Sequence, residues 1–314
     1  MKFLKNTTRL ALALVLTVLI FSSCKRFEGD ITVPAYLHLD RIDVTPQSSN
    51  APSVEPGFYT SDIDAVEVIC YFEGDNAETV LGVFQLPCTM PILHDGPIEY
   101  ITINPVVKQN GLSGTRIYYA FYEPIRLTDI TVSPNDTTNL GTLDPTTNEW
   151  TLETHYYTKE RINVLSEDFF EPTSFLTHFD STVTWVTDDP ENACTGKGYG
   201  LIHIADSEET RTFSIKDEFS PTSTQILYLE MDYKTDVDLY VNMIGFQVSS
   251  EGAATTKSVM CLYPTKTWKK IYINLGRTWS QFYYNTPLSI FFQAANTEGI
   301  EGDILLDNVK IITL

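Results

Sequence analysis

The sequence predicts an all-β protein built from two β-sandwich domains. From Ala35 onward, short runs rich in Val, Ile, Thr, Tyr and Phe are separated by clusters of Gly, Pro, Asn and Asp, which is typical of strands joined by turns. Helical periodicity is nearly absent from this region. The chain is 43% hydrophobic and 12% aromatic, so it can form hydrophobic cores, and its 314 residues are enough for two domains.

The first domain is expected at residues 35–160. AVEVICYF (65–72) places alternate apolar side chains on one face, as a strand requires. Six or seven short strands in about 120 residues predict an antiparallel sandwich of immunoglobulin-like type. The other strands are expected at 36–44, 79–86, 98–107, 116–127 and 149–157, and the turns at 73–76, 94–97, 110–114 and 133–136.

The second domain is expected at residues 161–314, with the junction near 158–166. Nine strands in about 150 residues predict a jelly roll, in which two packed sheets bury alternate residues. The expected strands are 181–188, 198–206, 211–219, 225–235, 237–248, 257–264, 268–276, 288–296 and 303–314.

The N-terminal residues predict a secretory signal peptide at 1–23. A basic head with two lysines and one arginine precedes the apolar run LALALVLTVLIF (10–21), which is followed by Ser22, Ser23 and Cys24. This run of 12 residues is shorter than the roughly 20 that a membrane-spanning helix needs.

The small residues before Cys24 resemble the lipobox of bacterial lipoproteins. Phe21 stands where these usually have Leu, and Ser23 where they often have Gly or Ala. The resemblance implies that Cys24 becomes the lipidated first residue of the mature chain, anchored in the outer membrane through a tether at 24–34. An uncleaved anchor and a soluble secreted form are the alternatives. The tether resembles the surface-export signal of Bacteroidetes lipoproteins loosely, which leaves the surface and periplasmic faces both open.

Two further resemblances cover the rest of the chain. The segment LGVFQLPCTMPILHDGPIEYITINPVVKQNGLSGTRIYYAFYEP, within residues 31–165, is similar to uncharacterised Bacteroidetes envelope lipoproteins, which carry no assigned activity. EDFF, WKKIYINL, LSIFFQA and DILLDNVKI, within 165–314, resemble the galactose-binding-like jelly rolls of carbohydrate-binding modules.

The charge of the chain excludes nucleic acid as a partner. The formal charge is −20, and removing residues 1–23 takes away three basic and no acidic residues, which leaves −23. Nucleic-acid binding depends on Lys and Arg neutralising phosphates. We interpret the excess of acidic residues as a means of keeping the chain soluble. The alternative is that they bind divalent cations.

Four cysteines remain besides Cys24. Export permits disulfides, and the domain division favours Cys70 with Cys88 and Cys194 with Cys261. Buried free thiols are the alternative, because Cys70 and Cys261 lie in strand-like apolar runs. Their spacing does not indicate a zinc site.

The sequence contains no motif of a known catalytic class. It lacks Gly-x-Ser-x-Gly, His-Glu-x-x-His and a Gly-rich phosphate loop, and its five histidines are scattered singly. We therefore expect a protein that is not an enzyme and that has no certain cofactor.

Structural calcium is the one metal that the jelly-roll resemblance implies. In such domains an acid near the first strand meets an Asp in the last strand, and here Asp168 or Glu171 would meet Asp307. The alternative is that Asp307 only caps or turns the last strand.

Loop aromatics are the candidate sugar ligands. Trp185, Trp279 and Tyr283 lie in or beside polar loops, and sugar-binding sandwiches stack pyranose rings on such side chains. Packing of these rings under their loops is the alternative.

The first functional hypothesis is a non-catalytic outer-membrane lipoprotein that binds another envelope protein or acts in envelope assembly. The alternative is a glycan-binding accessory lipoprotein that uses the jelly roll.

Overall fold

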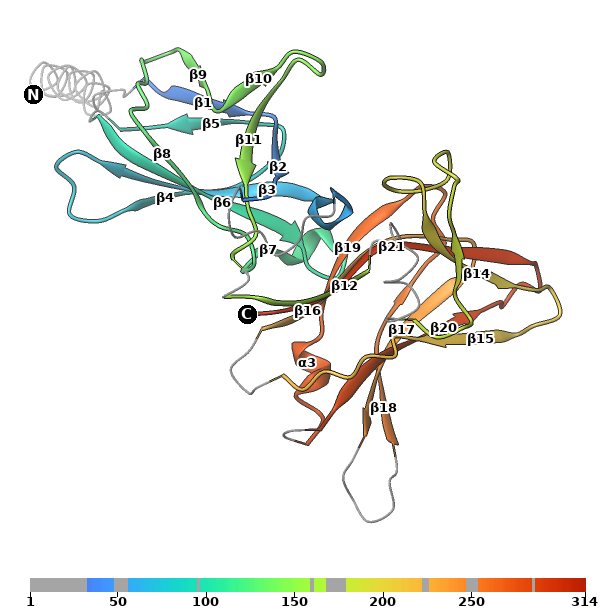
Figure 1. Cartoon of the computed structure of the whole chain (residues 1–314). Coiled ribbons are helices and arrows are strands. Elements are labelled where there is room, and N and C mark those ends of the chain that lie inside the picture. The colour runs from blue at the N-terminus through green and yellow to red at the C-terminus, as the bar shows by residue number, and fades with distance from the viewer. Residues whose placement is uncertain are drawn as a thin grey trace, which may run out of the picture.

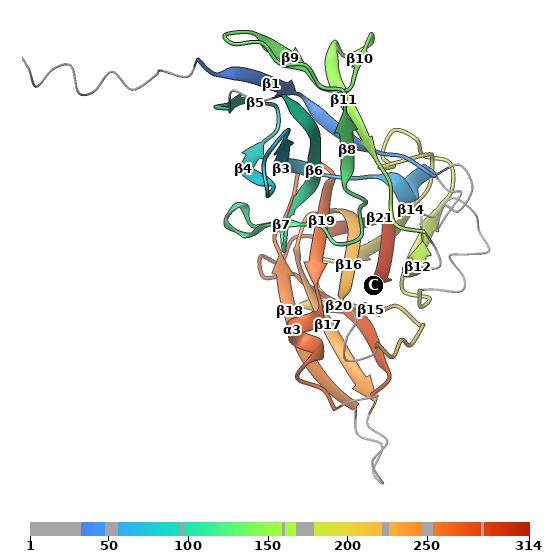
Figure 2. The same ribbon diagram turned by 90° about the vertical axis from the view of Figure 1, so that its left-hand side faces the viewer.

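The computed structural model describes residues 33–47, 56–94, 97–158, 161–167, 179–221, 226–246, 254–283 and 286–314. Over these residues the chain is nearly all β and forms two packed sandwiches (Figures 1 and 2), so the predicted fold class is confirmed. Three short helical segments are present among the described residues: η2 (Pro56–Tyr59), η3 (Ser113–Thr115) and α3 (Gly276–Trp279). None of the described helices is long and apolar enough to span a membrane.

The N-terminal sandwich has one continuous layer and one divided layer. The continuous layer runs β4-β3-β6-β7, with β8 also paired to β6; its strands are β3 (Ile63–Phe72), β4 (Thr79–Gln85), β6 (Ile98–Lys108), β7 (Arg116–Tyr118) and β8 (Ile125–Thr128). The divided layer consists of β5-β1-β9 and β10-β11-β2; its strands are β1 (Ala35–Leu39), β2 (Arg41–Val44), β5 (Cys88–Ile92), β9 (Thr137–Asn139), β10 (Thr142–Asp144) and β11 (Glu149–Thr154).

The core of this sandwich lies between the two layers. Val66, Val68, Cys70 and Phe72 of β3 are all buried on one face, as their alternation predicts, and they pack with apolar residues of β1, β5 and β6. The sheets are not purely antiparallel, because β1 pairs with β9 and β2 pairs with β11 in parallel. This differs from the antiparallel prediction. The partners in each parallel pair are about 100 residues apart in sequence, so no local turn signals them.

Two of the expected strands are interrupted. The expected strand 36–44 is divided at Asp40, whose carboxylate accepts a hydrogen bond from the Trp150 N–H at 2.7 Å. The expected strand 116–127 forms only β7 and β8. The aromatic residues between them leave the sheet and pack against the C-terminal half.

The C-terminal sandwich is a jelly roll of a six-stranded and a four-stranded sheet. The first has the order β13-β14-β21-β16-β19, with β12 also paired to β21; its strands are β12 (Asn163–Glu167), β13 (Thr184–Val186), β14 (Tyr199–Ile204), β16 (Leu227–Thr235), β19 (Lys269–Asn274) and β21 (Gly302–Thr313). The second has the order β15-β20-β17-β18; its strands are β15 (Thr210–Ser214), β17 (Asp238–Phe246), β18 (Ala254–Leu262) and β20 (Leu288–Ala295). The largest hydrophobic cluster fills the space between them.

The two halves share a third, aromatic cluster. In Figure 2 the N-terminal half stacks on the end of the C-terminal half where β16, β19 and β21 lie. Buried side chains from both halves meet there; they are Val44, Phe58, Val107, Tyr119, Phe121, Tyr122, Tyr156, Ile162, Tyr228, Tyr272 and Ile312. We call this the interface cluster. Ile162 belongs to it although it lies within the expected junction 158–166, so the halves are joined by packing as well as by the chain.

The four described cysteines are free thiols, so neither of the favoured disulfides is formed. Cys70 points into the N-terminal core from β3, whereas Cys88 lies on β5 in the other layer. Cys194 lies in the loop before β14, and Cys261 lies on β18 in the other sheet of its sandwich.

Candidate functional site: a pocket between the two sandwiches

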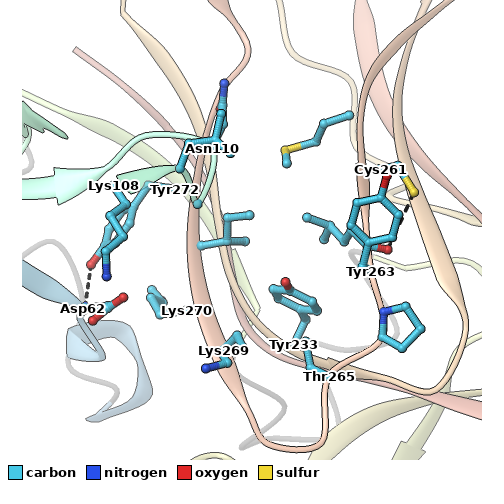
Figure 3. Close-up of a pocket in the computed structure, with 16 residues that line it drawn as sticks. Asp62, Lys108, Asn110, Tyr233, Cys261, Tyr263, Thr265, Lys269, Lys270 and Tyr272 are labelled. Atoms are coloured by element: carbon cyan, nitrogen blue, oxygen red, sulfur yellow. Dashed lines mark hydrogen bonds between the residues drawn. The ribbon is translucent and has the colours of Figure 1, made fainter. Parts of the chain in front are cut away.

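A pocket of about 440 Å³ lies where the turn after β6 faces β18 and β19 (Figure 3). Its volume falls in the range of about 300–1,000 Å³ that is usual for small-molecule sites. One wall comes from the N-terminal half and the other from the C-terminal half. The lining residues are Asp62, Lys108, Asn110, Gly111, Leu112, Tyr233, Met260, Cys261, Leu262, Tyr263, Pro264, Thr265, Lys269, Lys270, Ile271 and Tyr272.

The N-terminal wall is the Asn110–Gly111 turn, which the sequence predicts as a turn. Both residues have positive φ, 57° and 70°, a conformation that Asn and Gly adopt most readily. The turn is fixed to β19 by two hydrogen bonds. The Asn110 N–H donates to the Tyr272 carbonyl at 2.8 Å, and the Asn274 N–H donates to the Asn110 side-chain oxygen at 2.9 Å. The position of this wall therefore depends on contact between the halves.

The C-terminal wall is the connection from β18 to β19. These strands belong to different sheets, so residues 263–268 cross the open end of the sandwich. Tyr263 begins the connection and is 71% exposed, while Lys269 directly follows it and pairs with Tyr233 of β16. Figure 3 shows the Tyr233 ring between the side chains of Tyr263 and Lys269.

Several basic side chains line the pocket. Lys108 lies 3.1 Å from the Asp64 carboxylate, which also accepts from Arg116 at 2.8 Å. Lys270 is buried and lies 3.3 Å from Asp232. Lys269 forms no salt bridge with any residue that the structure describes.

The polar groups of the pocket suit binding better than catalysis. Glycoside hydrolysis needs two carboxylates across the reacting bond, and among the described lining residues Asp62 is the one carboxylate. Burial, together with the charge of Asp238, raises the pKa of the Cys261 thiol, so it stays protonated near neutral pH and is a poor nucleophile. The pocket can hold a ligand by stacking and hydrogen bonding.

The three predicted aromatic ligands do not meet in one place. Trp185 of β13 and Trp279 of α3 are half-buried against the core of the jelly roll. Tyr283 is 73% exposed. β13 is paired with β14, and the two ribbon views place β14 and α3 on different sides of the C-terminal half (Figures 1 and 2).

Asp307 lies inside β21 and is fully buried rather than at a strand end. Its carboxylate accepts from the Thr195 N–H at 3.0 Å. Asp168 and Glu171, its predicted partners for calcium, lie outside the described residues, as does Cys24. No group of three or more His, Cys, Asp or Glu side chains in the described part of the chain is arranged to hold a metal. Calcium binding stays a prediction.

Sequence reasoning missed Tyr263, Lys269 and the role of the Asn110 turn. Tyr263 falls in the expected strand 257–264, which gives no sign that the strand ends at Leu262 and leaves the ring exposed.

Two other hollows are present. One of about 350 Å³ lies over β15 and β20, and one of about 470 Å³ is lined by Asp236, Asp238, Glu298 and Glu301.

Comparison with known proteins gives distant similarity only. No family model and no curated protein matches the chain. Among solved structures, a family 29 carbohydrate-binding module is similar with a TM-score of 0.30 and 12% identity, over 48% of this chain and 86% of that one. A family 61 module in complex with β-1,4-galactotriose gives 0.28 and 14%, over 48% and 86%. The family 11 module of a cellulosomal cellulase of Clostridium thermocellum gives 0.29 and 15%, over 48% and 86%.

Proposed function

We propose that this chain is a non-catalytic, glycan-binding lipoprotein of the outer membrane, which holds its sugar in the pocket between the two sandwiches. The observation that carries the proposal is an exposed aromatic ring, Tyr263, at a pocket lined by hydrogen-bonding side chains. A pyranose ring has an apolar face and a rim of hydroxyls. It therefore binds where an aromatic face lies beside donors and acceptors.

The pocket offers both kinds of contact. Tyr263, Pro264 and Leu262 give an apolar surface, and Lys108, Asn110 and Thr265 bring polar groups. Because the walls belong to different halves, a sugar in this pocket contacts both sandwiches. Glycan binding is in this way coupled to the docking of the halves.

A glycan array followed by affinity gel electrophoresis tests the proposal, with the full-length chain purified in detergent. Tyr263→Ala should weaken binding of the retained glycan about tenfold or more, since loss of a central aromatic contact costs about 2 kcal/mol. Tyr283→Ala is the matched control, because Tyr283 is equally exposed but lies outside the pocket.

The outcomes separate the hypotheses. If Tyr283→Ala abolishes binding and Tyr263→Ala does not, the sugar site is at the loop after α3 and the pocket proposal is wrong. If no glycan is retained and an envelope protein co-purifies from solubilised membranes, the protein-binding hypothesis replaces the glycan one.

The membrane anchor has its own test. Lipid on Cys24 would hold the chain at the membrane, because each buried CH₂ contributes about 0.8 kcal/mol and several acyl chains together bind firmly. Cys24→Ala should move the protein to the soluble fraction. A variant that still sediments with membranes after carbonate washing would contradict lipid anchoring.

A further inference from the structure

We infer, on the basis of this proposed function, that the bound sugar carries one carboxylate, as a uronic acid residue does, and that Lys269 binds that carboxylate. The inference rests on the local charge of the pocket. In the whole chain, 41 acidic residues outnumber 21 basic ones, yet the pocket is lined by three lysines and a single aspartate.

The lysines that line the pocket differ in whether their charges are already paired. Lys108 and Arg116 share one carboxylate, that of Asp64. Lys270 and Lys310 are balanced by Asp232 and Glu230. Among the lining lysines, Lys269 is the one that no salt bridge pairs with a described residue.

Lys269 is therefore the lining cation best placed to bind an added carboxylate. Its side chain is exposed, and it has no salt-bridge partner among the described residues, whereas Lys108 and Lys270 are both engaged. Tyr263 begins the connection 263–268 and Lys269 directly follows it, and both line the pocket. Figure 3 shows the Tyr233 ring between the two side chains, so an oligosaccharide stacked on Tyr263 extends past Tyr233 to bring its carboxylate to the Lys269 ammonium group.

The acidic hollow of the same half offers the opposite environment. Asp236, Asp238, Glu298 and Glu301 line it without a lysine or arginine among its described lining residues. Like charges repel an anion there. On this acidic surface, the pocket between the halves is thus the hollow whose lining favours an anionic sugar.

The test compares each acidic sugar with its own methyl ester. Oligosaccharides of galacturonate and of glucuronate are titrated by calorimetry into the full-length chain, beside the corresponding methyl esters, which keep the ring and lose the charge. The acid should bind about fivefold more tightly than the ester, the effect of one exposed ion pair. This preference should shrink as salt is added, because salt screens exposed charges.

Variants assign the preference to a residue. Lys269→Gln should abolish the difference in affinity between acid and ester, and Tyr263→Ala should weaken the binding of both. Lys266→Gln is the matched control, because Lys266 is an exposed lysine of the same connection that does not line the pocket. Equal affinity for acid and ester, or equal loss with Lys266→Gln, would overturn the inference. Neutral glycans bound without any acidic preference would refute this inference alone, whereas the absence of all glycan binding would refute the proposed function as well.

Discussion

Glu230 and Lys310 form a buried ion pair that faces the opposite half of the molecule. They are paired across β16 and β21, with the Lys310 Nζ 3.0 Å from the Glu230 carboxylate. Tyr119 and Tyr156 of the N-terminal half donate their hydroxyls to the same carboxylate at 2.6 and 2.8 Å. The Lys310 ammonium donates to the Phe58 carbonyl as well. The pair is therefore fully hydrogen-bonded only while the two halves are docked.

The protonation of the pair follows from these contacts. Burial acts to raise the pKa of Glu230, but the charges of Lys310 and Lys270 and the two tyrosine hydroxyls together hold that pKa below its ordinary value. Burial lowers the pKa of Lys310 to about 8, in spite of the attraction of Glu230. Both groups are accordingly charged in the folded protein at neutral pH.

Removing one partner should destabilise the fold severely. Lys310→Met leaves the Glu230 charge buried with Lys270 3.9 Å away, and we expect a loss of about 3–5 kcal/mol in the free energy of unfolding. The double variant Glu230→Gln, Lys310→Met should recover most of that loss, because no uncompensated charge remains. Chemical denaturation measures the free energy of unfolding of the single and the double variant. Arg211→Met, which breaks the exposed ion pair with Glu208, is the control and should cost at most about 1 kcal/mol. If the stability losses of Glu230→Gln alone and Lys310→Met alone add up to the loss of the double variant, the two residues are not energetically coupled and the prediction is wrong.

Lys310 should also make stability rise with pH. Its pKa in the folded state, about 8, is below the ordinary 10.5, so between these values the unfolded chain holds a proton that the folded chain has released. Stability then increases with pH, by up to about 1.4 kcal/mol per unit. The buried thiols, whose pKa values are raised by burial, act in the opposite direction above their ordinary value of 9.0. Unfolding measured from pH 7 to 9 should show the rise in the wild type and not in the double variant. If stability changes with pH in the same way in the wild type and the double variant, the rise does not come from Lys310.

The Asn110–Gly111 turn should be intolerant of a side chain at its second position. Gly111 has a φ of 70°, and an added Cβ would lie 3.5 Å from the Ile271 side chain. The strain is conformational, about 1–2 kcal/mol for an L-residue in the left-handed region. Gly111→Ala should therefore lower stability by that amount and weaken glycan binding. Gly114→Ala, in the same loop with no atom within 4 Å of its Cβ and no positive φ, should change neither. Thermal unfolding and calorimetry compare the two.

Alternation made the strands of the jelly roll predictable. Each of the nine expected strands overlaps a strand in the structure, and β21 extends from Gly302 to Thr313 where 303–314 was expected. The contact between the halves could not be predicted in the same way. Glu230 and Lys310 are charged residues in alternating runs, and alternation assigns such residues to solvent. Only the docked N-terminal half buries them. The signal that was available is the aromatic run at 118–122, which does not continue as a strand.

The candidate site was less predictable than the fold. A loop aromatic is recognisable from sequence, but its exposure depends on packing. Trp279 is half-buried under its loop, whereas Tyr263, at a predicted strand end, is exposed. The pocket also needs residues about 150 positions apart, such as Asn110 and Tyr263, and no local pattern joins them.

Asp307 allows a decisive test of the calcium hypothesis. It is buried in β21, and the Thr195 N–H donates to its carboxylate, so Asp307→Ala should cost about 1–3 kcal/mol by leaving that donor unpaired, whether or not calcium binds. Calcium at a hundredfold excess over its dissociation constant would add about 2.7 kcal/mol by mass action. The hypothesis therefore predicts that a chelator lowers the melting temperature of the full-length wild type and leaves that of Asp307→Ala unchanged. Asp303→Ala, an exposed position of the same strand paired with His203, should keep the wild-type response. Identical wild-type melting curves with calcium and with chelator would exclude the metal and leave Asp307 as the residue that holds the loop before β14 against the sheet.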